Sequence, residues 1–276
     1  MTSRLHGMRY MLLRRLVQAG VLLLLAGGNL WGWQVLQGNL SHSRFLGTVP
    51  LGDPFAVLQL MAAGGLLAID ALLGATIVLV FYALVGGRSF CAWVCPVNPV
   101  TDLANRLGRS GALAKARGTL RISRRTRYGI LVLALVLSAL LGVPAFETVS
   151  PIGIIQRSIV FGTGVAWFAV AAVFLFDLLV HPNGFCGRLC PLGAFYAVVS
   201  RFSLVRVRHD HVRCTQCNDC LRVCPEPRIL ELVGQASGSV LDGVCTNCGR
   251  CLEVCHDDAL RFAWRDSAMT MKSGGS

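Results

Sequence analysis

Long apolar runs that alternate with basic connecting segments dominate this chain. Four runs are apolar enough, and close enough to the roughly 20 residues that cover a bilayer core, to be expected to cross a membrane as helices. They are residues 16–36, 66–85, 128–146 and 161–180. The chain after residue 202 is far more polar. We therefore predict an α-helical integral membrane domain over residues 1–202, a soluble domain over 203–264 and a flexible tail over 265–276.

A cleaved signal peptide would also begin with basic residues followed by an apolar stretch. The first run, however, exceeds the usual signal-peptide core, and no small-residue cleavage site followed by a polar mature chain comes after it. The segment 37–65 is predicted to be a mixed loop with a short helix from Phe55 to Met61. Helical spacing of apolar residues predicts further short helices at 100–107 and 194–202.

The composition and the distribution of charge favour a membrane protein with both ends in the cytoplasm. The chain is 54% hydrophobic and 14% charged, well below the roughly 25% charged residues of soluble domains. Its net charge of +12 would also suit nucleic-acid binding, but the basic residues flank the apolar runs. Cytoplasmic loops are enriched in Lys and Arg. We therefore assign the N-terminus, the 86–127 connection and the C-terminal domain to the cytoplasm of a bacterial inner membrane, and the connections 37–65 and 144–160 to the opposite side.

The strongest chemical signal is a cysteine spacing that occurs twice. Cysteines repeat as C-x2-C-x2-C-x3-C over residues 214–224 and again over 245–255. This is the spacing of bacterial ferredoxins with two [4Fe–4S] clusters, in which the fourth cysteine of each run binds the other cluster. By that rule the first cluster is bound by Cys214, Cys217, Cys220 and Cys255, and the second by Cys245, Cys248, Cys251 and Cys224.

Zinc binding and disulfides are the alternative uses of so many cysteines. Paired C-x2-C motifs also bind zinc, but zinc does not need three evenly spaced cysteines followed by a fourth, twice over. The even number of 12 cysteines would suit disulfides, whereas cluster ligands must stay reduced, as in the cytoplasm. The sequence therefore predicts a two-cluster ferredoxin-like α+β domain over residues 203–264.

A second pair of cysteine motifs follows the second and fourth apolar runs. Each has the form C-x3-C-P, so that residues 66–107 and 161–202 resemble two copies of one unit. The four cysteines are Cys91, Cys95, Cys186 and Cys190. Cysteines four residues apart share one face of a helix, so these thiols could bind a third cluster or cycle between dithiol and disulfide. Packing as small apolar side chains is the alternative.

Candidates for proton transfer are few. Asp177, four residues before His181 near the cytoplasmic end of the fourth run, could accept protons from a quinol, because ionisable residues in membrane segments are commonly functional. An ion pair with Arg188 is an equally simple role for it. The sequence has no C-x-x-C-H haem motif, glycine-rich nucleotide loop, P-loop or H-E-x-x-H, so haem attachment, nucleotide binding and metalloprotease chemistry are not predicted.

The ordered combination of these features resembles the NapH-type ferredoxin-like membrane component of periplasmic nitrate reductase systems. Four apolar runs, two C-x3-C-P motifs and a C-terminal two-cluster ferredoxin make up the resemblance, which extends from Arg14 to Phe262. Further similar segments are residues 38–39, 48–54, 91–105 and 175–179. The eight cluster cysteines of the family correspond to the eight in this chain. One departure is His256, which stands where a proline usually follows the last cysteine; it removes no ligand.

The resemblance implies a component of a quinol dehydrogenase. Such a protein takes electrons from quinol in the membrane and passes them through two [4Fe–4S] clusters, and any third centre at the C-x3-C-P motifs, towards periplasmic nitrate reductase. The implied partners are a NapG-like periplasmic iron–sulfur protein and a NapC-like tetrahaem cytochrome, with no nucleic acid. Two other roles fit the same motifs: a redox assembly or maintenance factor for a metalloenzyme, and a membrane anchor for a partner iron–sulfur protein.

Overall fold

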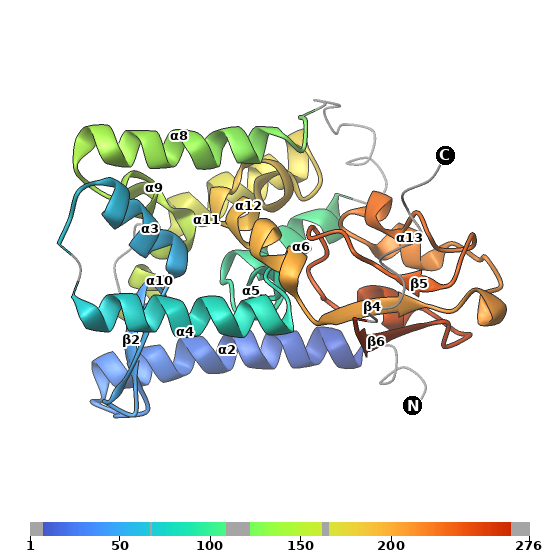
Figure 1. The fold of residues 1–276 in the computed structure, drawn as a ribbon, viewed down its shortest axis with the longest axis horizontal. Coiled ribbons are helices and arrows are strands. Elements are labelled where there is room, and N and C mark those ends of the chain that lie inside the picture. The colour runs from blue at the N-terminus through green and yellow to red at the C-terminus, as the bar shows by residue number, and fades with distance from the viewer. Residues whose placement is uncertain (1–7, 67, 109–121, 162–165, 266–276) are drawn as a thin grey trace. The chain divides into compact units, whose positions relative to one another are not determined.

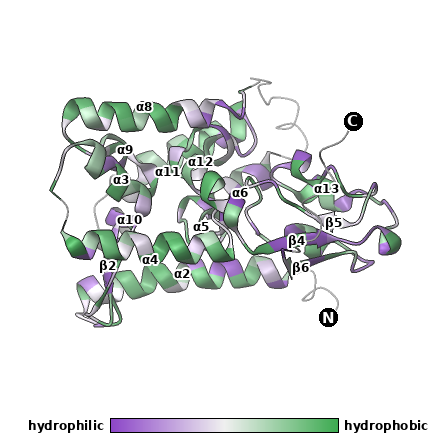
Figure 2. Cartoon of the chain, viewed as in Figure 1, coloured by the Kyte–Doolittle hydropathy of each residue, from purple (hydrophilic) through white to green (hydrophobic). Residues whose placement is uncertain are grey.

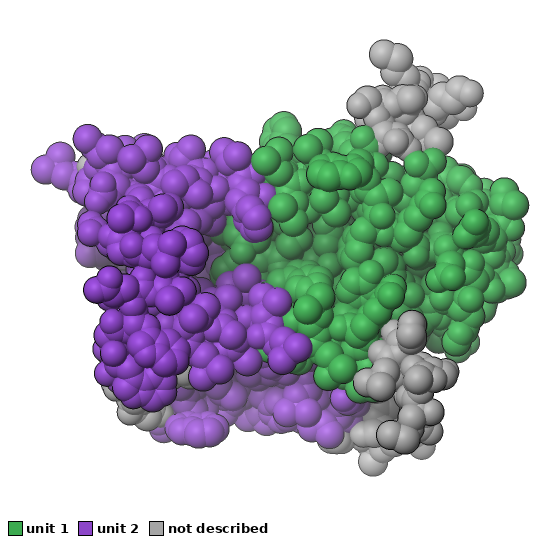
Figure 3. Space-filling view, turned by 90° about the horizontal axis from the view of Figure 1, so that it is seen from below, with its two compact units in different colours: residues 1–15, 82–93, 196–276 green, residues 16–81, 94–195 purple. Residues whose placement is uncertain are grey.

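The fold is known from a computed structural model that describes residues 8–66, 68–108, 122–161 and 166–265. Most of the predicted tail, part of the basic 86–127 connection and the start of the predicted fourth run lie outside the described residues. The chain divides into two compact units, coloured in Figure 3. Unit 1 comprises residues 1–15, 82–93 and 196–276, and unit 2 comprises residues 16–81 and 94–195.

Helix α2 (Arg9–Leu30) corrects the predicted position of the first apolar run. The run was expected to be helical over 16–36, but the helix begins earlier and residues 31–35 leave it. The reason is a tertiary contact, because strand β1 (Leu36–Gly38) folds back against the end of the helix. Asn29 Nδ2 donates to the carbonyl of Gly38 at 2.7 Å, and a Cβ on Gly28 would lie 2.0 Å from the carbonyl oxygen of Leu36.

The segment 37–65 is more ordered than the mixed loop that its sequence predicts. Strands β1, β2 (His42–Phe45) and β3 (Val49–Gly52) form an antiparallel sheet in the order β1-β2-β3, with Ser43 opposite Leu51. The predicted short helix is confirmed as α3 (Pro54–Ala62). Asp53 caps it by accepting the backbone N–H of Phe55 at 3.2 Å, and proline at the first helical position suits a helix start.

The remaining elements of unit 2 are mostly helices that pack side by side (Figure 1). They are α4 (Ile69–Val85), α6 (Val97–Leu107), α8 (Thr126–Leu141), α9 (Ala145–Val149), α10 (Pro151–Phe161), α11 (Ala166–Leu175) and α12 (Pro191–Val199), with two π-helical turns, η1 (Phe176–Val180) and η2 (Phe185–Leu189). Both α4 and α12 continue into unit 1. α3 packs against α8, and α11 packs against α6 and α10. The 144–160 connection, for which the sequence predicted no helix of its own, is largely helical, because α9 and α10 lie within it.

One helix in the described part of the chain, α2, is long and apolar enough to cross a membrane by length and composition. The other apolar helices, α4, α8 and the continuous α11–η1, have between 10 and 17 residues. These helices are largely apolar, as their green ribbons in Figure 2 show, and several of their large apolar side chains are exposed. Ile69 is 74% exposed, Leu140 76% and Phe168 81%.

Unit 1 contains a small α+β fold. Strands β4 (Val205–His209), β5 (Gly238–Ser239) and β6 (Leu260–Trp264) form an antiparallel sheet in the order β5-β4-β6. Helices α13 (Asp219–Val223) and α14 (Arg250–Glu253) pack against each other. The 3₁₀ turns are η3 (Ser200–Phe202), η4 (His211–Arg213) and η5 (Pro227–Leu230). The core of this fold consists of Val207, Cys220, Ile229, Leu230, Val240, Val244, Cys251 and Leu260.

Candidate iron–sulfur site

The two cysteine runs fold into loops with the same backbone. In each loop the residue before the second cysteine and the residue after it have positive φ: Gln216 (57°) and Asn218 (63°) in one loop, Asn247 (48°) and Gly249 (75°) in the other. Each short helix, α13 or α14, begins directly after the second of these residues. Left-handed residues are uncommon outside glycine and mark positions where the chain must turn sharply. Two loops of equal spacing thus curve in the same way.

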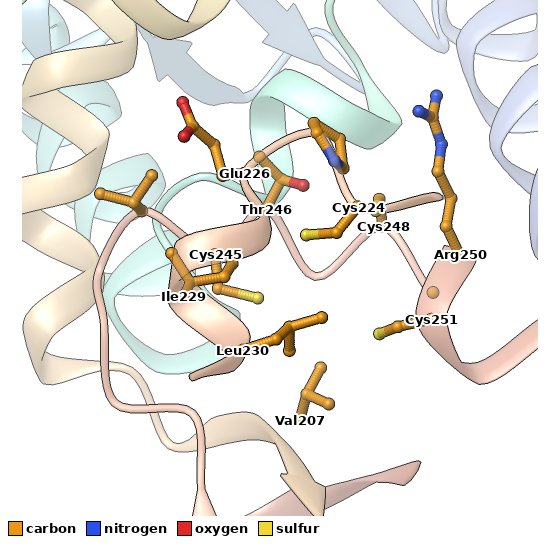
Figure 4. Close-up of a pocket in the computed structure, with 13 residues that line it drawn as sticks. Val207, Cys224, Glu226, Ile229, Leu230, Cys245, Thr246, Cys248, Arg250 and Cys251 are labelled. Atoms are coloured by element: carbon orange, nitrogen blue, oxygen red, sulfur yellow. The ribbon is translucent and has the colours of Figure 1, made fainter. Parts of the chain in front are cut away.

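Four cysteines line a single pocket in unit 1. Figure 4 shows the sulfur atoms of Cys224, Cys245 and Cys251 turned towards the middle of this pocket, and Cys248 also lines it. The pocket holds about 420 Å³ of empty space, counted out to its opening. Its other walls are largely apolar and include Val207, Ile229, Leu230 and Val244. Three cysteines of the second run and the last cysteine of the first run therefore meet, as the crossed spacing predicts.

The other four cysteines form a second group. Burial raises the pKa of Cys220, and the nearby thiols of Cys217, Cys255 and Cys214 raise it further. These effects indicate that Cys214, Cys217 and Cys255 lie near Cys220, and Cys220 in turn acts on Cys251 of the first group, so the two groups are neighbours. The two groups differ in exposure, because Cys217 and its loop neighbours Thr215, Gln216 and Asn218 are exposed, whereas Asn247 and Gly249 of the other loop are buried.

The thiols of the pocket need a positive partner to be ionised. Burial raises the pKa of Cys224 to about 12 and that of Cys245 to about 11, and burial also raises the pKa of Cys251. The raised pKa values disfavour free thiolates at these positions. Iron–sulfur ligands are thiolates, and a bound cationic centre would stabilise this ionised form. Backbone N–H groups support these thiolates: hydrogen bonds from the backbone of Glu226 and of Asn247 lower the pKa of Cys224 and of Cys245, against the effect of burial.

The cysteines surround a space and do not converge on a point. Among residues 8–66, 68–108, 122–161 and 166–265, no three Cys, His, Asp or Glu side chains come close enough to hold a single metal ion. Four thiols around an apolar pocket suit a larger iron–sulfur centre, so the residues present fit a cluster.

Segments far away in the sequence hold the Cys245–Cys251 loop in place. Helix α5 (Ser89–Trp93) lies against it: Arg88, just before the helix, donates from Nη1 to the carbonyl of Val244 at 2.9 Å, and Trp93 donates from Nε1 to the carbonyl of Asn247 at 3.0 Å. The Asn247 side chain in turn donates to the carbonyl of Val205 at 3.1 Å. The α5 helix is therefore fixed to this loop at both of its ends.

The N-terminal end of α2 also contacts this part of unit 1. The backbone N–H of Met11 donates to Glu253 Oε1 at 2.8 Å, and the ring of Tyr10 meets that of Phe262 edge-on at 5.7 Å. Gly249 lies directly under Tyr10, since a Cβ there would come within 2.5 Å of the ring.

The C-x3-C-P cysteines are divided between the two units. Cys91 lies in α5 of unit 1, and Cys95, Cys186 and Cys190 belong to unit 2. The expectation that each pair shares a helix face needs correction. Cys91 and Cys186 lie within short helices, but Cys95 and Cys190 follow their ends. The cause is the proline after each second cysteine, because a residue before proline is disfavoured in the helical region.

Asp177 and His181 are positioned by local structure in unit 2. Asp177 is fully buried and accepts the backbone N–H of Phe185 at 2.9 Å, which joins the turn η1 to the turn η2 that carries Cys186. His181 is half-buried, and its Nδ1 donates to the carbonyl of Pro182 at 2.8 Å. Asp177 therefore has a structural role in shaping the second C-x3-C-P segment.

Comparison with known proteins places the chain in a family. It is 46% identical to the ferredoxin-type protein NapH of Escherichia coli K12, over 80% of this chain and 77% of that protein. The chain belongs to the NapH-type ferredoxin family. The methylamine utilization ferredoxin-type protein MauN of Methylorubrum extorquens is 44% identical to this NapH-type chain over 83% of it and 79% of the relative. MauN of Paracoccus denitrificans is 42% identical, over 85% and 83%.

The NapH-type chain also matches two families of iron–sulfur domains. A family described as a 4Fe-4S dicluster domain matches residues 206–256, over the two cysteine runs. One described as a 4Fe-4S binding domain matches twice, over residues 67–112 and 163–209. These two ranges coincide with the two similar units found in the sequence, and each contains a C-x3-C-P motif. No solved structure matches the chain.

Several residues of the site could not be recognised from the sequence. In the sequence, Arg88 is only one of the basic residues of the 86–127 connection. In the structure it is buried, at 3% exposed. Trp93 and Asn247 lie between the cysteines of their motifs. That position was the one sign in the sequence that they belong to the site. Their partners lie 154 and 42 residues away in the chain, which no local pattern reveals.

Proposed function

We propose that this NapH-type protein is a membrane electron-transfer subunit that takes electrons from quinol and passes them through iron–sulfur centres towards periplasmic nitrate reductase. The observation that carries the proposal is the single pocket lined by Cys224, Cys245, Cys248 and Cys251, which belong to both cysteine runs. The ligands of one [4Fe–4S] cluster are Cys214, Cys217, Cys220 and Cys255, and those of the other are Cys245, Cys248, Cys251 and Cys224. Each bound cluster supplies one-electron transfer; the chain supplies the thiolates, the hydrogen bonds to sulfur and the exclusion of water.

The C-x3-C-P motifs are proposed to hold a third redox centre. Cys91 lies on a helix whose two ends are hydrogen-bonded to the Cys245–Cys251 loop, so a centre that includes Cys91 would exchange electrons with the neighbouring cluster over a short path. The match of both C-x3-C-P segments to a 4Fe-4S binding domain supports this role. Asp177 and His181 remain candidates for proton transfer from quinol in this proposal.

The membrane arrangement in this proposal has four helices that cross the bacterial inner membrane, with both termini and the ferredoxin domain in the cytoplasm. The basic connections and the exposed apolar side chains of α4, α8 and α11 support it, because large exposed apolar surfaces mark contact with lipid or protein. Alkaline phosphatase fusions test it. They should be active within residues 37–65 and 144–160, and inactive within 86–127 and at the C-terminus; the opposite pattern would refute the topology.

The direct test of electron transfer is anaerobic purification, with iron and acid-labile sulfide counted and EPR spectra recorded before and after addition of a reduced quinol analogue. About eight irons per chain, with signals that appear on quinol addition, would support two clusters fed by quinol. About twelve irons would support the third centre. Full clusters that dithionite reduces and quinol does not would refute quinol oxidation and favour the maintenance role.

A second candidate acceptor is a methylamine-oxidising system. The observation in its favour is the similarity to proteins named for methylamine utilization, which nearly equals the similarity to NapH. Complementation separates the two: expression of this chain should restore periplasmic nitrate reduction to a strain that lacks its own NapH. Restoration of growth on methylamine to a strain that lacks MauN, without restored nitrate reduction, would assign the chain to the second system. In either strain, co-purification with NapG-like and NapC-like proteins would identify the partners.

A further inference from the structure

Two buried arginines stand beside one of the two cysteine groups of unit 1. Arg88 is 3% exposed and Arg206 is 1% exposed. Arg88 donates from Nη1 to the carbonyl of Val244, the residue before Cys245. Arg206 donates from Nε to the carbonyl of Ser203 at 3.3 Å, and its guanidinium also contacts the carbonyl of Ser200. Arg206 directly precedes Val207, which lines the same pocket as Val244 and Cys245, so both arginines belong to the surroundings of one cysteine group.

Three other charged residues lie near this pocket: Glu226, Asp242 and Arg250. Glu226 and Arg250 line the pocket, and Figure 4 shows the charged end of each directed away from its middle. Asp242 acts on Arg206, but it is exposed, and water screens an exposed charge far more than a buried one. Glu226 is also buried, at 6% exposed, so two buried guanidinium groups and one buried carboxylate lie at this pocket among the residues described.

The other cysteine group lacks this arrangement among the residues described. Its neighbouring arginines, Arg213 and Arg222, have side chains that are 62% and 78% exposed. Each is paired with an aspartate on its own loop or helix, Arg213 with Asp210 and Arg222 with Asp219. Exposed and paired charges contribute little to the potential at a nearby site. The loop around Cys217 is also open to solvent.

The reduced form of a cluster carries one more electron than the oxidised form, so a nearby positive charge stabilises it and raises the reduction potential. The potentials of iron–sulfur clusters respond to net charge, hydrogen bonds and exposure. We propose that Arg88 and Arg206 hold the reduction potential of the cluster at Cys224, Cys245, Cys248 and Cys251 above that of the other cluster. The more positive cluster is then the first of the two to be reduced. This inference rests on the proposed two-cluster function.

The experiment is an EPR-monitored redox titration of the full-length protein in detergent, with iron counted in every sample. The iron count tests the two-cluster function, and the potentials test the inference. In the wild type, two separate one-electron steps are expected. Arg88→Gln and Arg206→Gln should each move the more positive step to lower potential by about 59 mV or more, which is a tenfold change for one electron, and leave the other step in place. Arg88→Lys, which keeps the charge, should stay close to the wild type.

Arg261→Gln is the matched control, because Arg261 is an exposed arginine of the same unit, on β6. It should move neither step. The inference fails if the arginine variants move both steps equally, move the lower step, or move neither, or if Arg88→Lys shifts the potential as far as Arg88→Gln.

A measurement on the wild type keeps the inference testable if a variant loses iron. With only the first cluster reduced, a water-soluble paramagnetic complex should broaden its EPR signal little, because Asn247 and Gly249 of its loop are buried. Strong broadening of that first signal would show that the exposed cluster is reduced first and would overturn the assignment. Eight irons with such broadening would refute the inference and leave the two-cluster function intact.

Discussion

Replacement of Asn247 by alanine should loosen one cysteine loop and leave the other unchanged. Asn247 is 7% exposed, and its side chain donates to the carbonyl of Val205 at 3.1 Å and, at the longer distance of 3.4 Å, to that of Val85. Loss of the shorter bond leaves a buried carbonyl without this donor, at a cost of about 1–3 kcal/mol. Alanine also tolerates the φ of 48° less well than asparagine, which adds about 1 kcal/mol. The free energy of local opening should therefore fall by about 2–4 kcal/mol.

The assay is the anaerobic loss of cluster absorbance in excess iron chelator. A change of 2 kcal/mol corresponds to about a 30-fold change in an equilibrium constant, so one kinetic phase, carrying about half of the iron, should accelerate by about 30-fold or more in Asn247→Ala. Asn247→Gly removes the same hydrogen bonds without backbone strain, and its rate should lie between those of the wild type and Asn247→Ala.

The equivalent position in the other loop provides the control. Gln216 also has a positive φ, but it is exposed, and its side chain donates to the carbonyl of Gly234 at 3.0 Å. Gln216→Ala should cost only about 0.5–1 kcal/mol, since water replaces an exposed hydrogen bond. Equal rates of iron loss from Asn247→Ala and Gln216→Ala would refute the reasoning, because the buried contacts would then contribute nothing.

Two further changes test other contacts. Gly249→Ala places a Cβ within 2.5 Å of the Tyr10 ring at a φ of 75°, so it should lower iron content, whereas Gly238→Ala, where nothing lies within 4 Å, should retain it; equal iron contents would contradict this packing. Burial raises the pKa of Glu147 above its ordinary value of 4.5, against a hydrogen bond from Ser41 and the charge of Arg157, which lower it. The unfolded chain then loses this proton first, so stability falls as pH rises from about 4.5 through the folded-state pKa. Glu147→Gln should flatten that part of the curve of melting temperature against pH, and a curve unchanged from that of the wild type would exclude the effect.

The sequence determined the features that depend on local spacing. The two C-x2-C-x2-C-x3-C runs predict two sets of four ligands, and in the structure Cys224 lines one pocket with the three cysteines of the second run. Each loop is short, and its turn is set by the left-handed residues within it. The helix at Phe55–Met61 was equally local, with Asp53 and Pro54 to start it. The family resemblance was also correct, since it rested on an ordered series of motifs along the whole chain.

The tertiary structure decided what depends on residues far apart. The sheet at residues 36–52 was missed because its strands are three or four residues long, too short to show a clear alternation. The first helix ends at Leu30 because β1 folds back on it, a contact that no local pattern of apolar residues contains. Arg88 and Trp93 became part of the cluster environment only because the chain returns about 150 residues later to receive their hydrogen bonds. Whether a charged side chain is buried depends on how the whole chain packs. That packing places Arg88, a basic residue of a predicted loop, beside the residue that precedes Cys245.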